Sequence, residues 1–161
     1  MNGAQQLLTI ASILLITVLL INVHRSTGDK ILTTYTNESF IAGTSIAQSL
    51  IDEMSIKSFD EQTIEYPALE VDNLTSSGFL GPDPGEDSRE SFDDVDDYNQ
   101  YEETISNDRM GEFNITISVS YVDRDNLEII SSSKTFTKNI TVSVTNYNLP
   151  ITLVVSRVIG Y

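Results

Sequence analysis

Cysteine is absent from this chain of 161 residues, histidine occurs once, and lysine plus arginine number only 9. Without cysteine the chain has no disulfide, no thiolate metal site and no thiol nucleophile, and one histidine leaves little room for catalytic triads or imidazole metal clusters. With 24 Asp+Glu the formal net charge is -15, so phosphate backbones repel the protein and we do not expect nucleic acid as a partner. Carboxylate chemistry, binding and structural roles remain.

A long uncharged segment opens the chain, because no Asp, Glu, Lys or Arg precedes Arg25. The 20 residues from Ala4 to Val23 would rise about 30 Å as a helix, which is the thickness of a bilayer's hydrocarbon core. We therefore expect residues 1–25 to be a transmembrane helix. Its large apolar side chains are Leu7, Leu8, Ile10, Ile13, Leu14, Leu15, Val18, Leu19, Leu20 and Ile21.

A secretory signal that is removed is the alternative, but the start is not basic and no small-residue cleavage site follows the apolar run. Arg25 and Lys30 follow the span, and taken alone they place the C-terminal side in the cytoplasm. Long translocated domains obey that rule poorly, and we expect this one to lie outside the cytoplasm. Four glycosylation sequons fit export but also arise by chance: Asn37, Asn73, Asn114 and Asn139.

Residues 26–60 carry a second helical pattern. Its apolar residues recur every three or four positions and form one stripe: Ala42, Ile46, Ala47, Leu50, Ile51 and Met54. The stretch Ser26–Asp29 contains Gly28, which is unfavourable inside a helix by about 1 kcal/mol, so the two helical segments are either continuous or kinked there. We expect the stripe to cover a sheet.

Residues 112–161 predict that sheet. Apolar and polar residues alternate from Phe113 to Tyr121 and again from Ile140 to Val144, which is typical of strands with one wet face. Leu127–Ile130 begins another run, and Ile151–Ile159 forms the last one. Short polar turns between runs indicate an antiparallel meander. The fold class we predict is α+β, with a long N-terminal helix packed on three or four antiparallel strands.

Residues 61–111 form an acidic region with glycine and proline, which we expect to be a surface loop. Asp83 to Glu103 holds ten carboxylates and one arginine. Ca²⁺ takes six to eight oxygen ligands, and we consider it a possible cofactor. The alternative is a solvated loop, or one that docks on a partner's basic patch. The candidate ligands are Asp93, Asp94, Asp96 and Asp97.

Two apolar residues among these acids, Val95 and Tyr98, are expected to pin the region onto the sheet. Glycoside hydrolysis needs two carboxyl groups placed across a cleft, and adjacent aspartates in a loop do not provide that arrangement. We therefore expect no enzymatic activity and no catalytic residue.

Several short strings resemble those of the type IV pilin-like proteins, most closely minor pilins of the MshD kind. They are the apolar N-terminal helix, the stretch Ile46–Glu53, Leu80–Asp83, the string Phe92–Asn99 and the C-terminal strands. The resemblance implies a subunit that is anchored in the inner membrane by its helix before assembly. That helix then packs in the core of a filament or secretion pseudopilus.

Family members have a basic leader that ends in Gly and an acidic residue five positions into the mature chain. By that resemblance Gly3 is the processing position, Ala4 becomes the first mature residue, and Leu8 stands where the family has its acid. The acid pairs with a neighbour's N-terminal amine during assembly, so its absence favours a minor, initiating or tip-located subunit. We expect the partners to be other pilin-like subunits and, before assembly, membrane lipid. The alternative function is a non-polymerising, membrane-anchored ligand- or Ca²⁺-binding module exposed outside the cytoplasm.

Overall fold

The computed structural model describes residues 2–161, which divide into two compact units, one that runs to Glu38 and one over Ser39–Tyr161. Helix α1 spans Gly3–Met54 and therefore contributes to both units. The first unit consists of this helix alone over its described residues. The second unit adds strands β1 (Glu102–Asn107), β2 (Gly111–Tyr121), β3 (Thr137–Thr145) and β4 (Leu153–Gly160).

In the first unit, α1 is continuous through Ser26–Asp29, so Gly28 does not break or end it. The hydroxyl side chains along the apolar run donate to the helix's own backbone, as Ser12 Oγ does to Leu8 O at 2.6 Å and Thr17 Oγ1 to Ile13 O at 2.8 Å. These bonds satisfy the polar side chains without a partner from another element. The helix is long and apolar enough to cross a membrane, and the described residues of its most apolar window are not buried within this chain.

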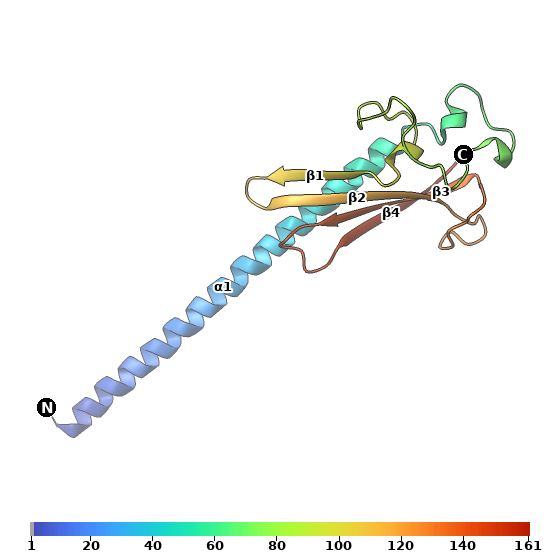
Figure 1. The fold of residues 1–161 in the computed structure, drawn as a ribbon. Coiled ribbons are helices and arrows are strands. Elements are labelled where there is room, and N and C mark those ends of the chain that lie inside the picture. The colour runs from blue at the N-terminus through green and yellow to red at the C-terminus, as the bar shows by residue number, and fades with distance from the viewer. Residues whose placement is uncertain (1) are drawn as a thin grey trace. The chain divides into compact units, whose positions relative to one another are not determined.

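The four strands form one antiparallel sheet in the order β1-β2-β3-β4, the predicted meander (Figure 1). From Phe113 to Tyr121, every second residue of β2 is buried, because each second side chain of a strand points to the same face. β3 pairs with β2 so that Val142 lies opposite Ile117, and with β4 so that Val142 lies opposite Val155. Buried residues therefore meet in rows across the sheet.

The last turns of α1 cover one face of this sheet and complete the core of the second unit. The predicted stripe is confirmed, since Ala47, Leu50, Ile51 and Met54 are buried and pack with the strand residues. A Cβ added at Gly43 would lie 3.6 Å from Val144, so the helix backbone approaches β3 closely. Burial of each large side chain contributes about 1.5–3 kcal/mol to folding. The strand residues in this core are Phe113, Ile115, Ile117, Val119, Ile140, Val142, Val144 and Leu153.

Two strand assignments differ from the sequence pattern. β1 is not predicted, because Ile105 is its one large apolar residue and the strand lies inside the acidic region. A tight turn sets its pairing: Asn107 Oδ1 accepts bonds from the backbone N–H groups of Arg109 and Met110, and Gly111 follows with φ 78°. Leu127–Ile130 is not a strand but a turn, with one isolated bridge between Ile130 and Val122.

Residues 55–101 connect α1 to β1 and contain three short 3-10 helices, Glu61–Thr63, Val71–Asn73 and Asp96–Tyr98. Parts of this connection are buried. Phe92, Val95 and Tyr98 join the main core, and this confirms the expected anchoring by Val95 and Tyr98. Phe59, Ala68 and Leu74 pack with Tyr121 in a second, smaller cluster.

Candidate functional site

The acid-rich segment is folded into the second unit instead of extending into solvent. Asp94, Asp96 and Asp97 are 0%, 2% and 1% exposed, whereas Asp93 is exposed. The expectation of a surface loop is therefore wrong for three of the four predicted ligands. A buried carboxylate is costly unless it is hydrogen-bonded or paired, so each of these groups needs a partner.

Two backbone hydrogen bonds fix this segment beside the end of α1. Ser58 N–H donates to Asp93 O at 3.1 Å, and Val95 N–H donates to Ser58 O at 3.0 Å. Lys57 Nζ adds a bond to Phe92 O at 2.5 Å. The two bonds therefore hold the backbone on both sides of Asp94 against Ser58.

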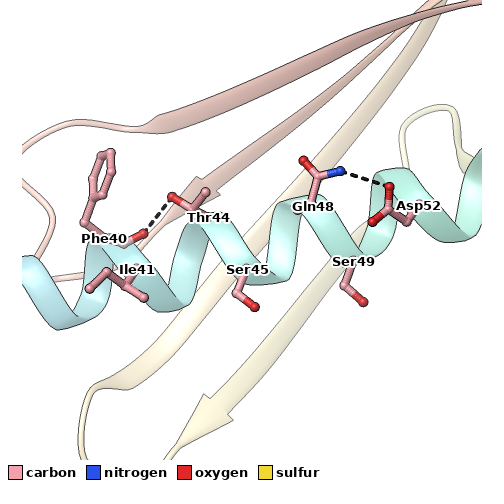
Figure 2. A pocket seen from close by; sticks show the side chains of 7 residues that line it. All are labelled: Phe40, Ile41, Thr44, Ser45, Gln48, Ser49 and Asp52. Carbon is pink, nitrogen blue, oxygen red and sulfur yellow. Dashed lines mark hydrogen bonds between the residues drawn. The ribbon is translucent and has the colours of Figure 1, made fainter.

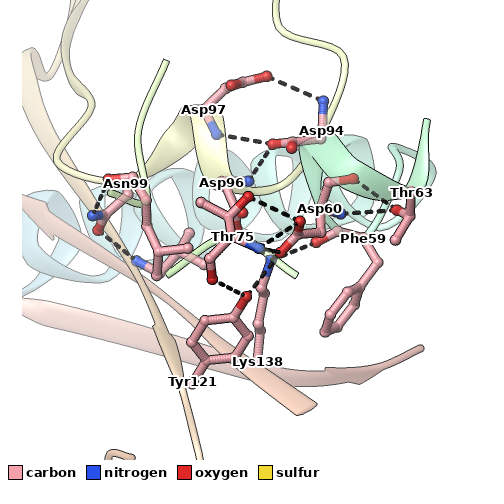
Figure 3. A network of polar contacts seen from close by, with 12 residues as sticks. Phe59, Asp60, Thr63, Thr75, Asp94, Asp96, Asp97, Asn99, Tyr121 and Lys138 are labelled. Atoms are coloured by element: carbon pink, nitrogen blue, oxygen red, sulfur yellow. Dashed lines mark hydrogen bonds and ion pairs between the residues drawn. The ribbon is translucent and has the colours of Figure 1, made fainter. Parts of the chain in front are cut away.

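Lys138 of β3 lies at the centre of the buried polar network and is fully buried (Figure 3). Its Nζ donates to Asp60 Oδ2 at 2.8 Å, to Asp96 Oδ1 at 2.6 Å and to the carbonyl oxygen of Phe59 at 2.8 Å. The same nitrogen lies 4.4 Å from the ring centroid of Phe59 and 5.0 Å from that of Tyr121. Two carboxyl groups, one carbonyl and two aromatic faces therefore surround one amine.

Asp60 is the better satisfied of the two carboxyl groups. Its oxygens accept bonds from the backbone N–H groups of Gln62 and Thr75, from Thr75 Oγ1 and from the Tyr121 hydroxyl at 2.8 Å. Burial raises the pKa of Asp60, but the hydrogen bond and charge of Lys138, with the Tyr121 bond, outweigh burial and lower the pKa below its usual value. Asp60 is therefore the carboxylate of the buried ion pair.

Asp96 and Asp94 differ from Asp60 in having few donors. Burial raises the pKa of Asp96 to about 7, against the opposing effect of Lys138. Burial, together with the charges of Asp96 and Asp97, raises the pKa of Asp94 to about 8. Asp94 Oδ1 accepts from the backbone N–H groups of Asp96 at 2.5 Å and Asp97 at 3.1 Å. The Oδ2 atoms of Asp94 and Asp96 are buried and accept no bond from any residue that the structure describes.

A second set of carboxyl groups, which we call the Glu86 group, consists of Glu86, Asp93 and Asp97. One oxygen from each lies within 4.8 Å of the others, close enough to share a cation. Burial and a hydrogen bond with Asp97 raise the pKa of Glu86. Asp97 Oδ2 also accepts from the backbone N–H groups of Asp93 and Asp94. Three oxygens of this kind fit Ca²⁺, which prefers carboxylates, with water to complete its coordination.

The structure divides the four predicted metal ligands. Asp93 and Asp97 lie in the Glu86 group, while Asp94 turns to backbone amides and Asp96 to Lys138. Sequence reasoning missed Glu86, which a turn places beside Asp83: Asp83 N–H donates to Glu86 Oε2 at 3.0 Å. No signal in the sequence fixes that turn.

Lys138 was also missed, although the sequence contains a signal for it. Lys138 is in phase with Ile140, Val142 and Val144 along β3, so period two places it on the buried face. A lysine on the buried face of a strand requires a carboxylate partner. That pattern predicts a buried ion pair, though it does not say which acid provides it.

The side chains predicted to face lipid or other helices are exposed within this chain. Their exposed fractions run from 47% at Ile21 to 70% at Leu7. Gly3, the predicted processing position, is the first residue of α1. In the second unit a further face of α1 remains uncovered, and it carries two large apolar residues beside small and polar ones: Phe40, Ile41, Thr44, Ser45, Gln48, Ser49 and Asp52 (Figure 2).

Chemically, the Lys138 network cannot receive a substrate as it stands, because its amine and both of its carboxyl groups are buried. Its amine and carboxyl groups contact one another and not the solvent. The Glu86 group is partly accessible and can meet ions from solvent, since Asp93 is exposed. Comparisons of the chain with protein-family models, with curated proteins and with solved structures gave no match.

Proposed function

We propose that this chain is a subunit, of the minor kind, in a type IV pilus-like filament or secretion pseudopilus. Before assembly, its helix would anchor it in the inner membrane with the second unit outside the cytoplasm. The observation that carries the proposal is the apolar first part of α1, whose large side chains have no cover within the described chain. Such a surface needs lipid or other helices around it.

The architecture supports the same proposal. A long N-terminal apolar helix that ends on an antiparallel sheet is compatible with a pilin-like fold. Helix association in such surroundings depends on close packing and on small or hydroxylated residues. Ala11, Ser12 and Thr17 lie within the apolar run and leave room for a neighbouring helix.

Fractionation of cells that express the full chain tests this proposal. We expect mechanical shearing to release the wild-type chain as sedimenting multimers, and Leu14→Asp to abolish that release because a charge within lipid or a helix bundle costs several kcal/mol. Leu14→Ile is the matched control and should behave as wild type. A wild-type chain that stays monomeric in the membrane fraction after shearing would contradict the filament role.

Orientation is tested separately. The chain has no cysteine, so Glu65→Cys, at an exposed position of the second unit, introduces one unique thiol. We expect a membrane-impermeant maleimide to label this variant in spheroplasts without lysis. Labelling only after lysis would place the second unit in the cytoplasm.

The alternative is an anchored module that binds Ca²⁺ and does not polymerise, and the observation that favours it is the Glu86 group. The two functions are distinguished by combining shearing with a calcium titration of the full chain in detergent. Calcium binding by a chain that remains monomeric supports the module, and release of multimers supports the filament subunit.

A further inference from the structure

The amine of Lys138 lies within bonding reach of a carboxyl group that is far away in sequence. Nζ is 2.6 Å from Asp96 Oδ1, and the two residues are 42 positions apart. Both side chains are almost fully buried, at 0% and 3% exposure. Well-oriented groups of one molecule react with effective concentrations of about 10⁵–10⁸ M, which removes most of the entropic barrier to a reaction between them.

The two carboxyl groups at Lys138 are suited to different roles. Asp60 receives several donors and stays ionised, so it can accept a proton from the amine at 2.8 Å. Asp96 has one oxygen on Lys138 and a second that is buried without a partner. Asp96 is therefore the carboxyl group that contacts the amine without donors on both of its oxygens, and it is the acid placed to react with the amine.

The surroundings also exclude water. The rings of Phe59 and Tyr121 lie over Nζ, and the amine itself has no exposed surface. In water an amine and an acid exist as a stable ion pair, and the charged forms do not condense. Burial disfavours the charged forms and so brings the pair closer to its reactive state.

We propose that Lys138 and Asp96 condense to an intramolecular isopeptide bond, an amide between Nζ and Cγ, with Asp60 as the proton acceptor. The bond that forms is N–C, and the bond that breaks is between Cγ and the hydroxyl oxygen of Asp96. Of the three hydrogens on the ammonium, one stays on the amide and one leaves with the hydroxyl as water. The third ends on Asp60 and is later released to solvent, so no oxidant or other reactant is required.

The cross-link joins the middle of the sheet to the connection that precedes it. Lys138 pairs with Tyr121 of β2 and Ile159 of β4, and Asp96 opens the 3-10 helix before β1. An amide at this point closes a covalent loop around β1 and β2. The chain has no disulfide, so this bond would be its one covalent cross-link.

Peptide mapping of the full-length protein, extracted in detergent, tests the proposal. Trypsin cleaves after Arg89, Arg109, Lys134 and Arg157 but cannot cleave after a linked Lys138. We expect a branched species of residues 90–109 and 135–157, lighter than its two parts by one water molecule, whose fragments place the link at Asp96. Recovery of free 135–138 and 139–157 as the sole products would overturn the proposal.

Two other products are distinguishable from the expected one and would also overturn it. A link to Asp60 would join residues 58–89, not 90–109, to residues 135–157. A succinimide at an aspartate would lower the mass of residues 90–109 alone, and hydroxylamine would cleave it while leaving an amide intact.

Variants separate the chemistry from folding. Lys138→Arg should give unlinked peptides, whereas Lys134→Arg, at a half-buried position outside the network, should leave the link complete. Asp96→Asn should yield the same branched mass as the wild type, because the amide product is identical and ammonia leaves instead of water. Asp60→Asn should slow formation of the link by about 100-fold or more, as expected when a proton acceptor is lost. A normal rate in that variant would rule out Asp60 as the acceptor.

Discussion

Two groups of carboxyl side chains in this protein differ in their charges, because one contains a lysine and the other consists of acids alone. In the Lys138 network, one amine contacts Asp60 and Asp96, and all three side chains are almost fully buried. In the Glu86 group, three acids approach one another with no lysine or arginine among them. Before any link forms, the first group is stabilised by its own cation. The second relies on backbone donors, on the charge of Lys57 near Asp93 and on any ion that the medium provides. Neighbouring acids in one short segment therefore have different partners: Asp96 contacts Lys138, and Asp97 contacts other acids and backbone amides.

Lys138→Ala should produce the largest change in the free energy of unfolding, a loss of stability. In the unlinked protein it leaves the buried Asp60 without its cation, and breaking a buried pair by removing one partner costs about 3–5 kcal/mol. Where the proposed link has formed, the variant loses that link as well. Chemical denaturation of the full chain in detergent, followed by near-ultraviolet circular dichroism of the buried tyrosines, measures the loss. Lys134→Ala is the control and should change stability by less than about 0.5 kcal/mol. Equal stability of the two variants would show that Lys138 does not balance the buried charge.

Stability should also depend on pH through Asp94. The pKa of Asp94 is about 8 in the folded state and about 3.9 in the unfolded state. Its contribution to stability is therefore complete below about pH 3.9 and is lost as the pH rises from there to about 8. The free energy of unfolding should fall by up to about 1.4 kcal/mol per pH unit within this window. Denaturation series from pH 5 to pH 9 check it.

Asp94→Asn is the matched variant for that series, since its side chain cannot ionise and its oxygen can still accept the two backbone bonds. The slope attributed to Asp94 should disappear. Asp60 acts in the opposite direction: its lowered pKa stabilises the fold above the unfolded value and loses that effect as pH falls through the folded pKa. An unchanged alkaline slope in Asp94→Asn would assign the effect to another group.

Calcium should stabilise the fold through the Glu86 group and leave the Lys138 network unaffected. A site of millimolar affinity that is filled at about ten times its dissociation constant stabilises the fold by about 1.4 kcal/mol. We expect Ca²⁺ to raise the denaturation midpoint of the wild type and not that of Asp93→Asn. Flat calorimetric heats into the millimolar range would remove Ca²⁺ as a ligand of this group.

Without calcium, Glu86→Gln should change the free energy of unfolding least, and it should raise stability where Lys138→Ala lowers it. It removes one of three mutually repelling carboxylates, so stability should rise by about 0.5 kcal/mol. The same denaturation assay measures it. A clear loss of stability would mean that the hydrogen bond from Asp83 N–H to Glu86 outweighs the repulsion.

The sequence predicts the repetitive parts of this molecule well. The alternation in β2 and the stripe on α1 each repeat several times, and the structure confirms both. β1 has one large apolar residue, Ile105, and its pairing depends on the turn at Asn107, so no pattern exposes it. The charged site was predicted as four equivalent aspartates. Its actual division depends on Lys138, which lies 42 residues from Asp96 and approaches it only once the sheet has formed.

The hydroxyl bonds along the first part of α1 have a consequence for movement. Thr9, Ser12, Thr17 and Thr27 all donate to carbonyl groups of their own helix. None of these bonds would have to be broken if the helix exchanged lipid for protein neighbours, as the proposed function requires. In the proposed function, these four side chains would therefore add no hydrogen-bond cost to the transfer of the helix between a membrane and a filament.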